Sequence, residues 1–148
     1  SRILEVFFRA GVNAVMSPGT LEPLADAIRD AEDRTGVEGI LISTPQLPIG
    51  PETPTQGFVT DVVKSLLDRE IEVRAKFCMP HTSTTDAMVD RCTREVRRMD
   101  ELCELIRERG MIPGLSTHLT ETIIYSDETA LDVETYISIY NAMGFLMP

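Results

Sequence analysis

The sequence holds two histidines, His81 and His118, and each closes a short apolar run next to hydroxyl side chains. His81 lies in the stretch 78–86 and His118 in the stretch 116–118. The first stretch also holds Thr82 and Asp86, which are candidate substrate-binding residues. An unperturbed imidazole titrates at about pH 6.5, so it can take up or release a proton near neutral pH. We therefore take His81 and His118 as candidate acid–base residues.

Two other roles for these histidines stay open. They could bind a metal ion together with Cys78, Asp86 or Glu121, because imidazole, thiolate and carboxylate are common metal ligands. Their spacing matches no established metal motif, so we assign no metal ligand. They could also be hydrogen-bonded residues with a structural role only.

Lys76 is a third catalytic candidate, because it stands in an apolar run that we expect to be a strand. A buried lysine loses its proton readily and can form a Schiff base. Arg74, Lys76 and Cys78 share one face of such a strand, and that face could point into a barrel. The alternative is a lysine whose charged head reaches the rim.

Polar residues also follow the first two predicted strands. Ser17 begins the turn Ser17-Pro18-Gly19-Thr20, and Thr44 follows the second strand. The turn leads into a helix, whose free backbone N–H groups could hold a phosphate or carboxylate. Alternatively, the turn only caps that helix. We count Ser17 and Thr44, with Thr82 and Asp86, as candidate substrate-binding residues.

Strands and helices alternate along the chain, which predicts a parallel sheet with helical crossovers. The run 39–43 is apolar throughout, as is typical of a strand buried on both faces. Such sheets place their sites at the carboxyl ends of the strands. The expected strands are 12–16, 39–43, 71–78, 112–116 and 136–140, and the expected helices are 2–10, 21–35, 59–67, 90–109 and 121–129.

About five β/α units fit this pattern, so we expect one domain, 1–148, with an incomplete (β/α)8 TIM-barrel fold. A complete barrel needs roughly 250 residues, whereas this sequence has 148. Both ends look cut from a longer coding sequence, which would leave two open sheet edges. We expect the chain either to pair with itself as a homo-oligomer or to rely on absent sequence. The competing fold is an open doubly wound sheet, but no G-x-G-x-x-G follows the first strand.

The helix expected at 90–109 rests on an apolar stripe with alternating spacings of four and three residues. Two of the three cysteines, Cys92 and Cys103, belong to that stripe and are expected in the core. An odd number of cysteines without paired spacing indicates no disulfide framework, which favours a reducing cytoplasm.

The composition argues against several partners. The net charge is −10, which disfavours nucleic acid and anionic membrane surfaces. No apolar run is long enough to cross a membrane, and no signal peptide is recognisable. The expected partner is therefore a small-molecule substrate.

Five short stretches, in order along nearly the whole chain, resemble those of the aldo/keto reductase barrels. The resemblance implies that His81 matches the family's catalytic histidine. It also implies that Ser116, Thr117 and Asn141 contribute to a nicotinamide site, with NADPH as the cofactor. The stretches are Gly11-Val12-Asn13, Leu41-Ile42-Ser43-Thr44, Met79-Pro80-His81, Gly114-Leu115-Ser116-Thr117-His118 and the segment from Asp132 to Tyr140-Asn141.

The sequence departs from this family at most of the catalytic tetrad. The family's catalytic Asp is replaced by Met16 or Ser17, and its catalytic Lys by Pro45. No tyrosine precedes Tyr125, so the family's proton donor is absent. The resemblance thus favours the barrel and a site at its mouth more than reductase chemistry. We expect an enzyme acting on a small anionic or carbonyl-bearing metabolite, with a metal-assisted lyase or isomerase and a non-catalytic barrel protein as alternatives.

Overall fold

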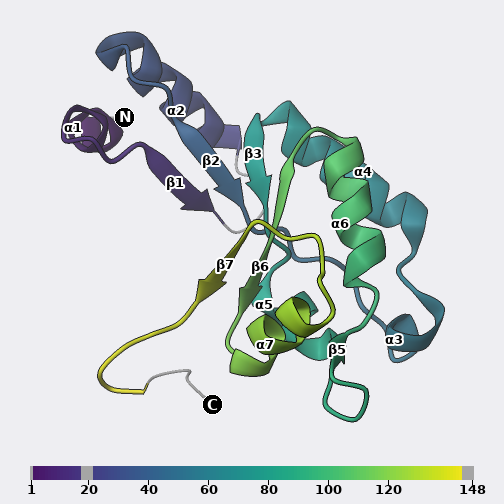
Figure 1. The fold of residues 1–148 in the computed structure, drawn as a ribbon. Coiled ribbons are helices and arrows are strands. Elements are labelled where there is room, and N and C mark those ends of the chain that lie inside the picture. The colour runs from purple at the N-terminus through teal and green to yellow at the C-terminus, as the bar shows by residue number, and fades with distance from the viewer. Residues whose placement is uncertain (1, 18–21, 145–148) are drawn as a thin grey trace.

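The computed structural model describes residues 2–17 and 22–144, which form a layer of helices around one curled parallel sheet (Figure 1). The five strands of this sheet are β1 (Ala14–Ser17), β2 (Ile40–Ser43), β3 (Ala75–Cys78), β6 (Ile112–Thr117) and β7 (Thr135–Ser138). They lie in the order β1-β2-β3-β6-β7, and every neighbouring pair is parallel. The parallel sheet and its curl are those expected of an incomplete barrel.

The helices of the described residues precede or connect these strands. They are α1 (Arg2–Arg9), α2 (Glu22–Thr35), α3 (Thr53–Gln56), α4 (Thr60–Glu72), α5 (Thr82–Thr85), α6 (Met99–Glu108) and α7 (Thr120–Glu128), with a 3-10 turn, η1 (Asp86–Met88). α4 packs against β3, α6 against β6, and α1 against α2. None of these helices is both long and apolar enough to cross a membrane.

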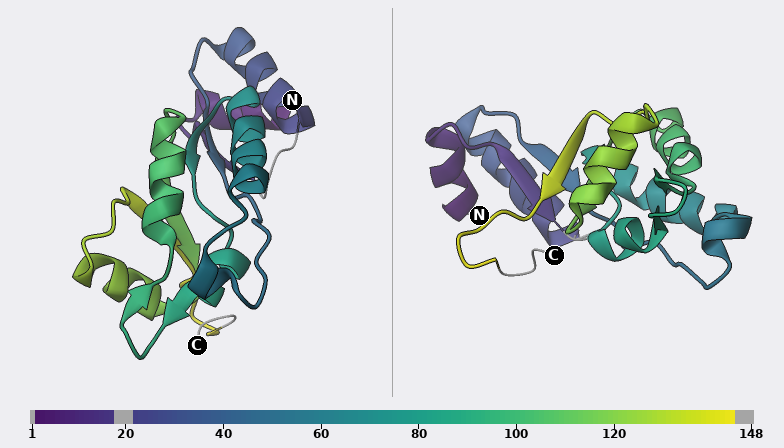
Figure 2. Two further views of the ribbon diagram at one scale, coloured as in Figure 1. Left: turned by 90° about the vertical axis from the view of Figure 1, so that its right-hand side faces the viewer. Right: turned by 60° about the horizontal axis from the view of Figure 1, so that its bottom comes forward.

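The core lies between the sheet and the helices that cover its outer face. Leu41 of β2 and Leu115 of β6 belong to one buried apolar cluster with Val63 and Leu67 of α4 and Ile106 of α6. The inner face is more open, since Met16 on β1 keeps 55% of its surface exposed. Figure 2 shows from two directions how the sheet curls from β1 to β7. Within the described residues, both of these strands have one edge without a partner.

The predicted helix 90–109 is wrong in its first half. Residues 89–96 form a hairpin of β4 (Val89–Asp90) and β5 (Glu95–Val96), and the helix begins only at Met99. Asp90 bends the chain by accepting the backbone N–H groups of Cys92 and Thr93, at 2.7 and 3.3 Å. The left-handed residues Arg94 and Arg98 complete the break, with φ of 56° and 61°. Cys92 is consequently exposed, whereas Cys103 is buried as expected.

The third strand is also shorter than predicted. Residues 71 and 72 still belong to α4, and Arg74, with φ of 64°, turns the chain into β3. The register between β2 and β3 shifts between Leu41 and Ile42. Cys78 is fully buried while Lys76 is exposed, so the predicted shared face of these two residues is wrong. An irregular strand does not keep the strict alternation on which that prediction rested.

Candidate functional site

The two histidines follow strands that are neighbours in the sheet. β3 and β6 are paired through Phe77 with Ile112 and Cys78 with Pro113. Beyond these pairs, the N–H of Ser116 donates to the carbonyl of Pro80 at 3.4 Å. His81 therefore follows one strand end and His118 the next, and polar side chains of both segments meet there.

Asp86 is the centre of this meeting. Its Oδ2 accepts hydrogen bonds from the Thr82 hydroxyl at 2.7 Å and from the His118 N–H at 3.1 Å. Its Oδ1 accepts a hydrogen bond from the Thr117 hydroxyl. We name Asp86, Thr82, Thr117, His118 and Thr122 the strand-end cluster. Asp86 lies at the start of η1, one helical turn after Thr82, so α5 carries it back over the end of β6.

The Asp86 carboxylate binds the backbone N–H of His118, and the His118 ring lies near the same carboxylate. The Nδ1 atom lies 4.0 Å from Oδ2 of Asp86, and the side chains are 31% and 21% exposed, respectively. This distance is too long for a hydrogen bond but short enough for charge attraction. Among the described residues, the Nε2 atom of His118 has no partner, so it is free to meet a ligand.

His81 is fixed differently, because its ring caps helix α5. The Nδ1 atom accepts a hydrogen bond from the N–H of Ser83 at 3.2 Å and lies 2.9 Å from its hydroxyl. The His81 N–H donates to the carbonyl of Pro45 at 2.9 Å. The ring is partly exposed, and its Nε2 has no partner among the described residues. This histidine too presents one free ring nitrogen.

The three predicted nicotinamide-binding residues, Ser116, Thr117 and Asn141, have different surroundings in the structure. The Thr117 hydroxyl is buried and engaged with Asp86, with Thr122 at 2.8 Å and with the N–H of Leu119 at 2.9 Å. Ser116 is partly exposed in β6. Asn141 follows β7, where its Oδ1 accepts the N–H of Met143 at 3.2 Å. A cofactor amide could reach the Thr117 hydroxyl only by displacing bonds that hold Asp86.

Ser17 and Thr44 serve to join two strand ends. Both the N–H and the hydroxyl of Thr44 donate to the carbonyl of Ser17, each at 2.9 Å. Both residues are buried, at 3% and 5% exposure. The rest of the predicted anion-binding turn, residues 18–20, lies outside the described residues. In the structure, these two predicted substrate-binding residues therefore form a contact between strand ends.

Lys76, the third catalytic candidate, is exposed in the middle of β3. It is therefore not the buried lysine that the expected Schiff-base role would require. The sequence reasoning missed another ionisable side chain, Glu70, which is only 2% exposed and accepts a hydrogen bond from the buried Ser43 hydroxyl. Glu70 follows Val63 and Leu67 at helical spacing, so the pattern would have placed it on the buried face of α4.

Glu70 also affects Cys78, which is register-paired with Ser43 across β2 and β3. Burial first, and then the nearby Glu70 charge, raise the pKa of the Cys78 thiol far above its usual range. A thiol held in its neutral form is a poor nucleophile. Cys78 is thus a core residue in this structure.

No metal-binding group is assembled in the part of the chain that the structure describes. There, no three histidine, cysteine, aspartate or glutamate side chains come together to hold an ion. Glu121, one of the predicted alternative ligands, is paired with Arg91 at 3.0 Å. Its own backbone N–H, and then Arg91, lower the pKa of its carboxyl group.

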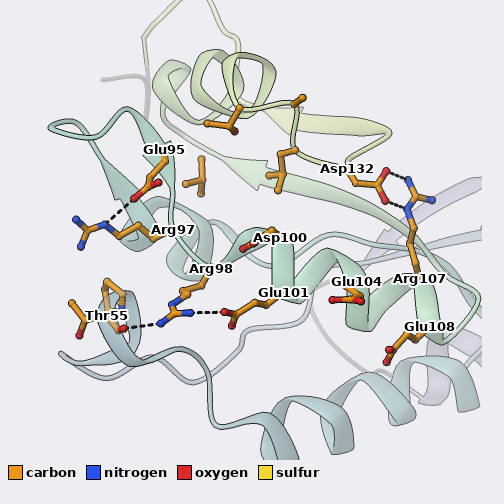
Figure 3. A pocket seen from close by; sticks show the side chains of 15 residues that line it. Thr55, Glu95, Arg97, Arg98, Asp100, Glu101, Glu104, Arg107, Glu108 and Asp132 are labelled. Atoms are coloured by element: carbon orange, nitrogen blue, oxygen red, sulfur yellow. Dashed lines mark hydrogen bonds and ion pairs between the residues drawn. The ribbon is translucent and has the colours of Figure 1, made fainter.

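A hollow lies elsewhere, along the outer face of α6 (Figure 3). This α6 groove has a volume of about 910 Å³. Its charged side chains mostly pair among themselves, as Arg98 does with Glu101 and Arg107 with Asp132. Neither histidine lines it, and none of the predicted site residues does. Its size therefore does not make it the better candidate for chemistry. The strand-end cluster stays the candidate site.

The comparisons with known proteins bear on the fold alone. No protein-family model matches the sequence, and no curated protein sequence does so either. The structure is similar to that of the carboxyl transferase domain from Rhizobium etli pyruvate carboxylase, with a TM-score of 0.58 and 12% sequence identity. The match covers 97% of this chain but only 23% of that one. At such low identity the similarity shows a shared α/β arrangement, and the resemblance to aldo/keto reductases stays a prediction.

Proposed function

We propose that this protein is an acid–base enzyme that acts on a small carbonyl-bearing metabolite at the carboxyl ends of β3 and β6. The observation that carries the proposal is the placement of His118 against Asp86, beside the strand end that bears His81. A carboxylate next to an imidazole stabilises the imidazolium that forms when the ring takes up a proton. Such a pair supplies a general base, and the second histidine supplies a further polar group.

The test is proton exchange at carbon, which needs no knowledge of the final product. The protein is incubated in D₂O with pyruvate, dihydroxyacetone or glyceraldehyde, and deuterium at the carbon next to the carbonyl is followed by NMR. We expect catalysed exchange with at least one compound and its loss in His118→Gln. The surface variant Glu104→Gln, in the α6 groove, is the matched control and keeps the activity. Equal exchange in the native protein and in a His81→Gln/His118→Gln double variant would contradict the proposal.

A titration with NADPH separates this proposal from a reductase function. The engaged Thr117 hydroxyl and the loss of three of the family's four catalytic residues argue for weak binding or none. We expect no saturable change in cofactor fluorescence at micromolar concentrations. Saturable binding would instead support the site implied by the resemblance, with Ser116, Thr117 and Asn141 as its residues.

We further propose that the fold is of the (β/α)8 barrel type and that a second copy covers its open edges. The support is the curled parallel sheet, in which β1 and β7 each have one edge without a partner among residues 2–17 and 22–144. The apolar residues Ile3 and Val6 on α1 are also 68% and 67% exposed. Exposed strand edges and apolar patches are costly in water and favour association. Light scattering tests this, because a stable monomer would contradict it. The free cysteines suit the reducing cytoplasm that we propose as its location.

A further inference from the structure

The groups around the two histidines favour the proton on opposite ring nitrogens. A backbone N–H can only donate a hydrogen bond, so Nδ1 of His81 must be the acceptor from Ser83. In the neutral ring the proton then resides on Nε2. His81 therefore presents an N–H donor at its free nitrogen.

His118 has the reverse arrangement. Its Nδ1 lies 4.0 Å from Oδ2 of Asp86, which is beyond hydrogen-bond distance but close enough for the negative carboxylate to attract an N–H proton. The same oxygen already fixes the backbone of His118, which keeps the ring beside it. This favours the tautomer with the proton on Nδ1 and a lone pair on Nε2. His118 therefore presents an acceptor at its free nitrogen.

From these contacts we infer a division of roles: His118 removes a proton from carbon, and His81 donates a hydrogen bond to the neighbouring carbonyl oxygen. The inference rests on the proposed function and names its substrate class. A ligand that satisfies both nitrogens has an acceptor oxygen and an acidic C–H on the adjacent carbon. Carbonyl compounds with a hydrogen at the α-carbon have this pattern.

The step balances without a further reactant. The α C–H bond breaks and its proton bonds to Nε2 of His118, while the electron pair forms a C=C bond and moves the C=O pair onto oxygen. The negative oxygen is stabilised by the Nε2–H of His81, which stays neutral, and the new imidazolium lies against Asp86. A neutral imidazole can polarise a carbonyl in this manner. Return of the proton to carbon restores both rings, after exchange with solvent.

Long-range ¹H–¹⁵N NMR on the native protein tests the tautomers directly. We expect the proton on Nε2 in His81 and on Nδ1 in His118 at a pH where both rings are neutral. A proton on Nδ1 of His81, or on Nε2 of His118, would overturn the division of roles, even if exchange is catalysed. This readout is independent of activity, so it separates failure of this inference from failure of the proposed function.

Kinetics in the D₂O assay give a second test. Glutamine can donate a hydrogen bond but cannot take up a proton, so His118→Gln should lower the exchange rate at least about 100-fold. His81→Gln should keep a larger share of the rate than His81→Leu, which cannot donate. Circular dichroism confirms that each variant is folded. Equal losses in His81→Gln and His81→Leu, or a fully active His118→Gln, would overturn the assignment, and no exchange by the native protein would overturn the proposed function.

Discussion

The strand-end cluster and the α6 groove differ in how their polar groups are arranged. In the cluster, one carboxylate, Asp86, receives donors from two separate segments. Among the described residues, Nε2 of His118 has no partner, and neither has Nε2 of His81 at the neighbouring strand end. In the groove, Asp100, Glu104 and Glu108 follow one another along a helix, and arginines at the rim pair with other acids. The groove is also lined by uncharged residues outside α6, such as Pro54, Val96 and Leu131, but no histidine lines it. We place the candidate acid–base site at the strand ends because a carboxylate and an imidazole come together there.

The same helix α6 allows the sharpest comparison between a buried face and a groove face. Ile106 is fully buried, whereas Glu104 points to the groove. We expect Ile106→Ala to lower the free energy of unfolding by about 3 kcal/mol, because it leaves a cavity in the core. Urea denaturation measures this, with Glu104→Ala as the control, which should change stability by less than about 0.5 kcal/mol. Similar losses in both variants would mean that the groove is a packed interface.

Asp86→Ala should have the next largest effect. It leaves the Thr82 and Thr117 hydroxyls and the His118 N–H without their acceptor in Asp86. Each partly buried donor without a hydrogen bond lowers the free energy of unfolding. We expect a loss of about 2 kcal/mol in the same denaturation experiment. If the variant were as stable as Glu104→Ala, Asp86 would not organise the strand ends.

Thr122→Val tests the hydroxyl behind the cluster. Thr122 is fully buried and its oxygen lies 2.8 Å from that of Thr117. Valine keeps the shape but loses one neutral hydrogen bond, which costs about 1 kcal/mol. A loss as large as that of Asp86→Ala would show that the two threonines act as one network with the carboxylate.

Arg107→Met should have the smallest effect on stability, because its partners Asp132 and Glu134 are at the surface. The measurable change is electrostatic: the hydrogen bond and charge of Arg107 lower the pKa of Asp132, so the variant should raise that pKa toward its usual value. A carboxyl group with a lowered pKa stabilises the folded state above its unfolded pKa and loses this contribution as the pH falls through the folded pKa. The variant should therefore lack this acid-dependent loss. An unchanged Asp132 titration by NMR would show that the pair does not form in solution.

Several elements could be predicted from the sequence, because their signals are local. The run 39–43 becomes β2, the segment 112–116 lies in β6, and the helix before Gly36 ends at Thr35. The hairpin at 89–96 could not be predicted from periodicity, because the spacing of Val96, Met99, Cys103 and Ile106 fits a helix and all four are indeed buried. The side-chain bonds of Asp90 and two left-handed arginines decide the turn, and neither leaves a pattern in the sequence.

For the site, the sequence by itself determined the types of the reactive residues and that both histidines follow strands. Adjacency along a parallel sheet then requires their strand ends to be close. Only the tertiary structure decided which atoms meet: Asp86 turns toward His118, the Thr117 hydroxyl toward Asp86, and Nδ1 of His81 toward its own helix. The physical reason is that the sequence gives the residue types directly. Whether two groups form a hydrogen bond depends on differences of a few tenths of an ångström in the distance between segments that are far apart in the chain.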